Sequence, residues 1–424
     1  MNTDEFIQYL KKKGTGPTMS KSLSKEELGR VSLFFDDPDL PLVTKATMLT
    51  AMVLLDATPA EADWLAQTRA DLTCIPETIR WLLTGEATSD LESAVLAIVR
   101  GEELSGRDAD RWMESLFDPA VPAWGKAALL ESLRLRRETE IENKAALAAC
   151  LRRTSPVSVN LPVVIDISIA YDGFNRNLFL APFVAAVLAA MGFPTVVHGM
   201  DEVSPKKGVN TRKILTRADK RAVRSPEMIA EDLTSVGWTY ADQSVFCPAL
   251  YALKPLRLEM VKRPILATVE KLLLPVRGAK TFVVTGYTHP PYKGKTVTLL
   301  NCLPIAGGII VRGLEGSTQL PLDRRAPQMV VRPGQAPMDG FIRPEDVGLE
   351  TEEDRILPDT EITIGDCLDA GVAALNGESG LASRMIRYQA AQIVATAGLA
   401  DRPLARVDDV ISSGEALRRW QCLK

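Results

Sequence analysis

The sequence predicts an α/β fold in which a small all-α N-terminal domain precedes a large α/β domain with a mainly parallel central sheet flanked by helices. Residues 1 to about 155 are rich in Leu, Ala and Glu at helical spacing and contain few β-branched runs. Segment 161–215 instead alternates β-rich runs with helical ones. A strand, helix, strand, helix order needs crossover connections, and such connections place the strands parallel to one another.

The segment 161–215 supplies the core of the predicted α/β domain. Its apolar run Val163 to Ile167 predicts a strand, Phe179 to Met191 predicts a helix, and Pro194 to His198 predicts the next strand. Polar residues follow both strands, and ligands of parallel sheets bind at the carboxyl ends of the strands. We therefore expect the strand ends at Tyr171 and His198 to face each other across a shared anion pocket.

The N-terminal part contains an internal repeat with a constant spacing of 81 residues, which predicts a first helical module at 1–80 and a second at 81–155. Ser24 and Ser105 are the expected N-caps, and breaks are expected at Gly14 to Pro17 and at 84–90. The repeated pairs include Leu23 and Leu104, Ser24 and Ser105, Arg30 and Arg111, Asp37 and Asp118, Pro41 and Pro122, Lys45 and Lys126, and Glu61 and Glu142.

Composition excludes several function classes. A chain of 424 residues with a net charge of −4 has no general attraction for nucleic acid, so a basic surface must be local. The six cysteines form no CxxC pairs and have no His at ligand spacing, which indicates reduced, mostly buried thiols and no metal site. No apolar run is long enough to span a membrane and the N-terminus does not resemble a signal peptide, so we expect a cytoplasmic protein.

One local basic stretch runs from Lys206 to Arg224. Three interpretations stay open: a solvated helical face, a phosphate site formed with the loop around Lys206, or a nucleic-acid backbone site. The stretch sets eight cations against one acid, Asp219. The cations are Lys206, Lys207, Arg212, Lys213, Arg217, Lys220, Arg221 and Arg224.

The two loops after the predicted strands carry a family resemblance. They read SIAYDG at 168–173 and VHGMDEVSPKKG at 197–208. They resemble the GTGGD loop and the KHGNR…SSKSG segment of the glycosyltransferase family 3 superfamily, which includes anthranilate phosphoribosyltransferase and pyrimidine nucleoside phosphorylase. The resemblance implies a ligand- or phosphate-binding set that consists of Asp172, Gly173, Asn177, His198, Gly199, Ser204, Lys206, Lys207 and Gly208.

The chain also departs from the family pattern. Ser168, Ala170 and Tyr171 replace glycines that let backbone amides approach a pyrophosphate, while Met200 and Asp201 stand where the family has Asn and Arg. No acidic pair for magnesium is evident, so Mg²⁺ is implied only if a pyrophosphate substrate is bound. The motifs FCPAL, YTHPPY and VRGLEG resemble one branch that has lost the GTGGD glycines and includes members that bind DNA.

The resemblance also bears on domain organisation. The α/β domain is expected at 156–424, with the helical segment 246–275 packing back on the helical domain and lending Arg257 or Arg263 to the substrate side; either arginine could instead form an interdomain salt bridge. The family's single helical domain commonly forms a dimer contact, which implies a homodimer. Here the extra copy either enlarges a packing or oligomerisation surface, or places the first copy in the dimer position of the second.

Two functions from different classes follow. One is a phosphoribosyltransferase-like enzyme that binds a phosphorylated ribose or related anion in the interdomain cleft and transfers a pentosyl group by positioning and charge stabilisation. The other is a non-catalytic nucleic-acid-binding or regulatory protein that uses the same fold. A third possibility is a scaffold or regulator that acts through its duplicated helical module. No residue stands out as catalytic. The chain after Val311 is expected to be loop-rich and to end in three helices.

Overall fold

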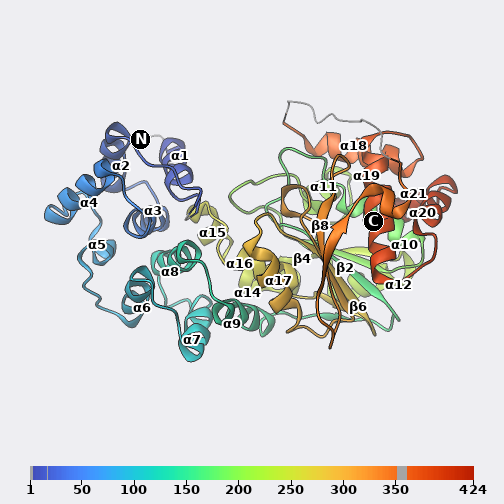
Figure 1. The fold of residues 1–424 in the computed structure, drawn as a ribbon, viewed down its shortest axis with the longest axis horizontal. Coiled ribbons are helices and arrows are strands. Elements are labelled where there is room, and N and C mark those ends of the chain that lie inside the picture. The colour runs from blue at the N-terminus through green and yellow to red at the C-terminus, as the bar shows by residue number, and fades with distance from the viewer. Residues whose placement is uncertain (1–2, 17, 351–360) are drawn as a thin grey trace. The chain divides into compact units, whose positions relative to one another are not determined.

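The structure is a computed structural model that describes residues 3–16, 18–350 and 361–424. The chain divides into two compact units. The helical unit comprises residues 1–149 and 252–267, and the sheet unit comprises residues 150–251 and 268–424 (Figure 1). The segment 252–267 therefore belongs to the helical unit, although it lies in the middle of the sequence of the sheet unit.

Short helices with capped N-termini make up the helical unit. Ser24 and Thr58 each form a capping box, and Ser105 accepts a hydrogen bond from the backbone N–H of Asp108. Pro41 and Pro122 directly precede their helices. The helices are α1 (Thr3–Lys13), α2 (Lys25–Asp36), α3 (Leu42–Leu54), α4 (Pro59–Ala70), η1 (Glu77–Ile79), α5 (Trp81–Thr84), α6 (Asp90–Val99), α7 (Gly106–Ser115), α8 (Ala123–Arg136), α9 (Glu140–Leu151) and α15 (Lys254–Met260).

Three hydrogen bonds of the helical unit recur at the spacing of 81 residues. In each case a buried lysine or glutamate side chain forms a hydrogen bond with a backbone group of a loop. Burial lowers the pKa of the two lysines, Lys45 and Lys126. The pairs are Leu23 N to Glu61 (3.0 Å) with Leu104 N to Glu142 (3.3 Å), Lys45 to Asp37 O (2.6 Å) with Lys126 to Asp118 O (2.8 Å), and Thr58 N to Glu61 (3.0 Å) with Thr139 N to Glu142 (2.8 Å).

Helices α3 and α8, which follow Pro41 and Pro122, pack against each other. Residues Val43 to Met52 of α3 and Gly125 to Leu133 of α8 are buried throughout. Ala46, Ala51, Ala127 and Ala128 are among them, and such small side chains let two helices approach closely. Their contact forms the centre of the helical unit.

A seven-stranded sheet forms the centre of the sheet unit, in the order β4-β3-β2-β6-β7-β8-β9. The first five strands are parallel and the last two antiparallel, so the predicted mixed α/β class with a mainly parallel sheet is confirmed. The strands are β2 (Val164–Ser168), β3 (Thr195–Gly199), β4 (Trp238–Asp242), β6 (Thr281–Gly286), β7 (Gly307–Val311), β8 (Ala326–Val331) and β9 (Met338–Ile342); β1 (Val157–Ser158) and β5 (Val276–Arg277) form a separate parallel pair.

Strand β2 leads through α10 to β3 on one side, whereas its other neighbour β6 leads through α17 to β7 on the opposite side. The chain thus reverses its winding direction between β2 and β6, and such a switch point opens a crevice at the carboxyl ends of the strands. Strands β2 and β3 consist of buried residues only. This burial agrees with the apolar β-branched residues of both strands, and it also covers the polar side chains of Asp166 and His198.

Helices cover the sheet. Helix α10 packs on β3, β4, α19 and α21 (Figure 1). In this core the Trp420 ring stacks on Trp238 and lies tilted against Phe183. The helices of this unit are α10 (Ala181–Ala190), α11 (Thr211–Arg217), α12 (Pro226–Ser235), α13 (Gln243–Phe246), α14 (Pro248–Tyr251), η2 (Glu270–Leu272), α17 (Pro291–Leu300), η3 (Leu314–Gly316), η4 (Pro344–Val347), α18 (Ile364–Leu375), α19 (Leu381–Ala397), α20 (Pro403–Ser412) and α21 (Glu415–Cys422), while α16 (Leu266–Val269) lies at the junction of the units.

Two features of the C-terminal half were not expected. Within the loop-rich chain after Val311, β8 and β9 form an antiparallel hairpin that extends the sheet. Residues Met338 to Phe341 of β9 are exposed, so this edge strand lacks the apolar alternation that would have predicted it. The tail holds four helices instead of three, because α20 lies between α19 and α21.

Within the described ranges no helix is long and apolar enough to cross a membrane. All six cysteines are free thiols. Cys150, Cys247 and Cys367 are buried, whereas Cys302 and Cys422 are exposed, so half of them are buried instead of most.

Candidate anion site

The carboxyl ends of β2 and β3 meet, as the sequence predicts, because the two strands are direct neighbours. The Tyr171 hydroxyl, just beyond β2, is hydrogen-bonded to His198 Nδ1, and His198 Nε2 lies 2.9 Å from Asp166 Oδ1. A carboxylate only accepts hydrogen bonds, so Nε2–H donates to Asp166. The Tyr171 hydroxyl lies between His198 Nδ1 and the carbonyl oxygen of Glu270, which is 3.1 Å away. All three side chains are buried, which gives His198 a structural place beneath the surface.

Two loops follow these strands and lie side by side. The first loop is 169–180 and the second loop is 200–210, and they are joined by an antiparallel bridge between Phe174 and Val209. The bridge contains two backbone hydrogen bonds of 2.8 and 2.9 Å, and Gly208 N donates to Asp172 O at 2.8 Å. The loops therefore form one paired ribbon over the strand ends.

The matched glycines serve this pairing. Gly173 has φ +75°, and a Cβ there would lie 2.5 Å from the carbonyl oxygen of Val209. At Gly208 a Cβ would lie 2.4 Å from the carbonyl oxygen of Phe174 and 2.3 Å from Asn175 Oδ1. Real side chains do not fit at such distances, so the close approach of the two loops to each other explains both glycines.

The paired loops direct four donors at one carboxylate, that of Glu315 in η3. Lys206 Nζ donates to Oε2 at 2.7 Å, Asn177 Nδ2 to Oε1 at 3.0 Å, Arg176 N to Oε1 at 2.9 Å, and Asn175 N to Oε2 at 3.3 Å. The ion pair is buried, with the Lys206 side chain 17% exposed and the Glu315 side chain 2% exposed. The loops thus form an anion site, and a carboxylate of the same chain lies in it.

The electrostatics of Glu315 agree with this geometry. Burial alone would raise the pKa of its carboxyl, but the hydrogen bonds from Lys206 and Asn177 outweigh burial and lower that pKa below its ordinary value. Lys206 Nζ also donates to the carbonyl oxygen of Gly173 at 3.1 Å and lies 5.7 Å above the Phe174 ring. The ammonium is therefore fixed by partners on several sides.

The other matched residues lie around the same loops. Ser204 is buried, Gly199 ends β3 against the Tyr240 hydroxyl, and Lys207 is exposed with Glu202 3.9 Å away. The departures from the family pattern are also explained, because Tyr171 and Met200 pack together in a small apolar cluster. Both side chains are therefore used in packing beneath the loops.

Most charges of the basic stretch have partners within the sheet unit. Arg212 pairs with Asp242 at 3.0 Å, Lys213 with Glu202 at 3.3 Å, and Arg224 with Asp232 at 2.8 Å. Lys220 donates to the carbonyl oxygen of Leu423 at 2.6 Å. The exposed cations of the stretch are Lys207, Arg217 and Arg221.

Arg257 and Arg263 belong to the helical unit. Arg257 is buried in α15, and Arg263 is exposed just after that helix. Their expected place on the substrate side stays a prediction. The same holds for the packing of segment 246–275 on the helical domain.

A resident metal does not fit this site. Across residues 3–16, 18–350 and 361–424, no three His, Cys, Asp or Glu side chains are grouped in a way that could hold a metal ion. Glu315, on whose carboxylate the loop donors converge, already neutralises Lys206. Any magnesium would have to be held mainly by the phosphates of a ligand.

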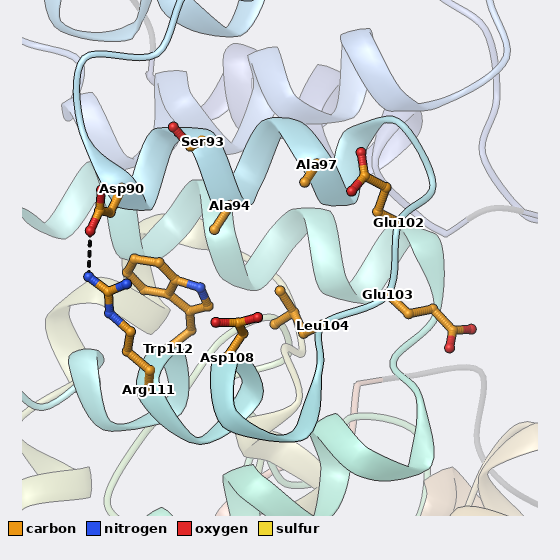
Figure 2. Close-up of a pocket in the computed structure, with 10 residues that line it drawn as sticks. All are labelled: Asp90, Ser93, Ala94, Ala97, Glu102, Glu103, Leu104, Asp108, Arg111 and Trp112. Atoms are coloured by element: carbon orange, nitrogen blue, oxygen red, sulfur yellow. Dashed lines mark hydrogen bonds and ion pairs between the residues drawn. The ribbon is translucent and has the colours of Figure 1, made fainter.

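A separate hollow of about 340 Å³ lies in the helical unit between α6 and α7 (Figure 2). Its charged lining is mainly acidic, and its one cationic side chain, Arg111, pairs with Asp90 at 2.6 Å. Such a lining repels phosphate. The lining residues are Asp90, Ser93, Ala94, Ala97, Glu102, Glu103, Leu104, Asp108, Arg111 and Trp112.

Comparison with known proteins gives a consistent result. An anthranilate phosphoribosyltransferase of Chloroflexus aurantiacus is 24% identical over 336 residues, which cover 78% of this chain and 96% of the relative. The crystal structure of the Thermus thermophilus anthranilate phosphoribosyltransferase has a TM-score of 0.63, 24% identity, and covers 77% of this chain and 97% of its own. This chain is similar in sequence and in fold to the anthranilate phosphoribosyltransferases.

The divergence is visible in other comparisons. An uncharacterized protein of Aquifex aeolicus is 28% identical over 257 residues, covering 60% of this chain and 75% of the relative. The Saccharomyces cerevisiae anthranilate phosphoribosyltransferase in complex with PRPP and Mg has a TM-score of 0.56 at 15% identity, covering 94% of this chain and 97% of its own. No family model matches the chain. The chain thus shares the fold of the anthranilate phosphoribosyltransferases at low sequence identity.

Glu315 was not foreseen from the sequence. It lies in VRGLEG, 139 residues beyond Arg176, and nothing in that spacing brings it to the loops. The sequence did contain one indication of this ion pair. Glu315 is an acidic residue in a glycine-rich turn, and such a residue can pair with a cation of another loop. Only the order of the strands shows that this turn lies at the switch point.

Proposed function

We propose that this chain binds the phosphate end of a phosphorylated ribose at the anion site of the two paired loops, as a phosphoribosyltransferase-like protein. The observation that carries the proposal is the convergence of Lys206, Asn177 and two backbone N–H groups on one anionic group. A phosphate has the charge and the acceptor oxygens to take the same donors. The ligand class comes from the similar fold of the Saccharomyces cerevisiae anthranilate phosphoribosyltransferase, whose structure is a complex with phosphoribosyl pyrophosphate (PRPP) and Mg.

The chain's own residues would position a ligand instead of reacting with it. Lys206 supplies a positive charge to a phosphate, and the N–H groups of Asn175 and Arg176 orient its oxygens. His198 and Asp166 lie beneath the loops and hold Tyr171, so they support the site without reaching its surface. Pentosyl transfer is the reaction this arrangement serves, because such chemistry depends on positioning and charge stabilisation.

Calorimetric titration with PRPP in the presence of magnesium tests the proposal. We expect measurable binding by the unaltered chain and a loss of at least tenfold in Lys206→Met, because one charge-assisted contact contributes about 1.5–3 kcal/mol. Lys293→Met is the matched control, since Lys293 pairs with Asp339 on the β9 hairpin and its replacement removes the same charge elsewhere. Equal weakening in both variants would contradict a site at Lys206.

Nucleic-acid binding is the second candidate, favoured by the exposed cations Lys207, Arg217 and Arg221 beside the second loop and α11. Gel shifts with single- and double-stranded DNA at two salt concentrations distinguish the two functions. Binding through phosphate contacts weakens steeply with salt, and three cations support only a shallow dependence. Retarded DNA at physiological salt together with absent PRPP binding would favour this candidate over the first.

We propose further that the helical unit is a tandem repeat, 1–80 and 81–155, whose copies pair through α3 and α8 within one chain. The support is the equivalence of the two helices at the 81-residue spacing and their mutual burial. A homodimer, as expected from the family, would then have to use another surface. Deletion of residues 1–80 exposes α8, so the sedimentation mass should rise by self-association; an unchanged state of assembly would contradict the pairing.

A further inference from the structure

Glu315 has a backbone conformation that its residue type does not favour. Its φ of +52° and ψ of 22° lie in the left-handed region, which is less favourable for a residue with a side chain than for glycine. Glycines are plentiful in this turn, with Gly313 and Gly316 on either side. A glutamate at this position therefore persists against a local cost, and the four hydrogen bonds to its carboxylate offset that cost.

The turn that carries Glu315 lies against the carboxyl end of β6. A Cβ at Gly286 would lie 1.9 Å from the carbonyl oxygen of Ser317, and one at Gly313 would lie 2.2 Å from the same oxygen. Gly316 approaches Thr288 Oγ1 in the same way, at 2.2 Å. Three glycines thus allow the turn to settle where the sheet reverses direction, which is where a ligand of this fold class would enter.

We propose that Glu315 is an intramolecular anion that occupies the phosphate site, so that a ligand phosphate must displace it in order to bind. Its carboxylate accepts every donor that the paired loops direct inward, and its side chain is almost fully covered. A second anion beside it would meet a like charge in a poorly solvated place. The occupancy follows from the contacts alone, and the ligand class, pyrophosphate or a phosphorylated ribose, rests on the function proposed above.

The consequence is a conformational cost on binding. A ligand that binds only when the turn has moved away has its apparent affinity reduced by the fraction of molecules in the open state. Replacement of Glu315 by glycine removes the competing carboxylate and suits the left-handed backbone, so the variant should fold. Glu315→Gln keeps the size of the side chain and removes its charge, which separates charge competition from steric blocking.

Two measurements test the proposal. In the first, PRPP is titrated calorimetrically into the unaltered chain, Glu315→Gly, and Glu315→Gly with Lys206→Met. We expect roughly tenfold or greater tightening in Glu315→Gly, a smaller gain in Glu315→Gln, and loss of the gain in the double variant. Equal affinity of the unaltered chain and Glu315→Gly would overturn the inference and leave the proposed function standing.

The second measurement needs no ligand. Lys206 is acetylated with a limiting amount of reagent and its modification is followed by mass spectrometry, with Lys293 as an internal reference. We expect the rate at Lys206 to rise several-fold in Glu315→Gly, because the amine loses its ion pair and its cover. An unchanged rate would overturn the occupancy. A raised rate without PRPP binding in any variant would support the occupancy and refute the proposed ligand.

Discussion

Alanine at Gly208 should force apart the two loops that form the anion site. The added Cβ would lie 2.4 Å from the carbonyl oxygen of Phe174, and a backbone atom cannot rotate out of the way. The bridge between Phe174 and Val209 contains two hydrogen bonds, each contributing about 1 kcal/mol. Overpacking adds about 1–3 kcal/mol, so Gly208→Ala should lower the free energy of unfolding of the sheet unit by about 3–5 kcal/mol.

Three further glycines of the sheet unit separate the cost of a steric clash from the cost of backbone strain at positive φ. Gly173→Ala combines a contact of 2.5 Å with a φ of +75°, so it should exceed Gly208→Ala by about 1–2 kcal/mol. Gly192 has a φ of +87° and open space around it, so alanine there should cost only the strain of about 1–2 kcal/mol. Gly294 in α17 has neither a close contact nor a positive φ. Because alanine favours a helix more than glycine does, Gly294→Ala should raise the free energy of unfolding of the sheet unit by about 0.5–1 kcal/mol.

Equilibrium urea unfolding followed by circular dichroism provides the comparison, with PRPP titration of the folded variants alongside. The order of stability should be Gly294→Ala, then Gly192→Ala, then Gly208→Ala, then Gly173→Ala. If Gly208→Ala were as stable as Gly294→Ala and had lost only PRPP binding, the glycine would serve the ligand, and the pairing of the loops would not explain it.

Two further predictions concern the helical unit. Thr58→Ala and Thr139→Ala each remove an equivalent N-cap, so both should lower the unfolding free energy by about 1 kcal/mol, and a difference of more than twofold between them would contradict equivalent modules. Burial lowers the pKa of Lys262 from 10.5 to about 7, while its Nζ donates to Leu10 O at 2.7 Å. The unfolded chain then binds more protons between about pH 7 and 10.5, so stability should rise with pH across that window; Lys262→Met should abolish this contribution, and an unchanged pH profile would refute it.

Much of the fold was predictable because its signals are local. The apolar run before Tyr171 and the run that ends at His198 become β2 and β3 within a residue or two, and the capped helices begin at Ser24 and Ser105 as expected. Periodicity and capping act over a few residues, so a sequence displays them directly. Strand β9 gave no such signal, because its residues are exposed and do not alternate.

The site was predictable only in part, because its chemistry depends on contacts between distant segments. The sequence placed Lys206 and Asn177 near a shared anion, and the structure brings them together on one carboxylate. The resemblance also placed His198 in the ligand-binding set, whereas the structure buries that ring between Tyr171 and Asp166. The partner of a charge can lie anywhere in the chain, so charge pairing is decided by topology instead of local pattern.

A crystal structure of Glu315→Gly grown with pyrophosphate would show whether the carboxylate of Glu315 occupies a phosphate site. We expect a phosphate group in the place of the missing carboxylate, within hydrogen-bond distance of Lys206 Nζ and of the N–H group of Arg176. Pyrophosphate bound elsewhere, with the loops 169–180 and 200–210 unchanged and the space beside Lys206 empty, would contradict it.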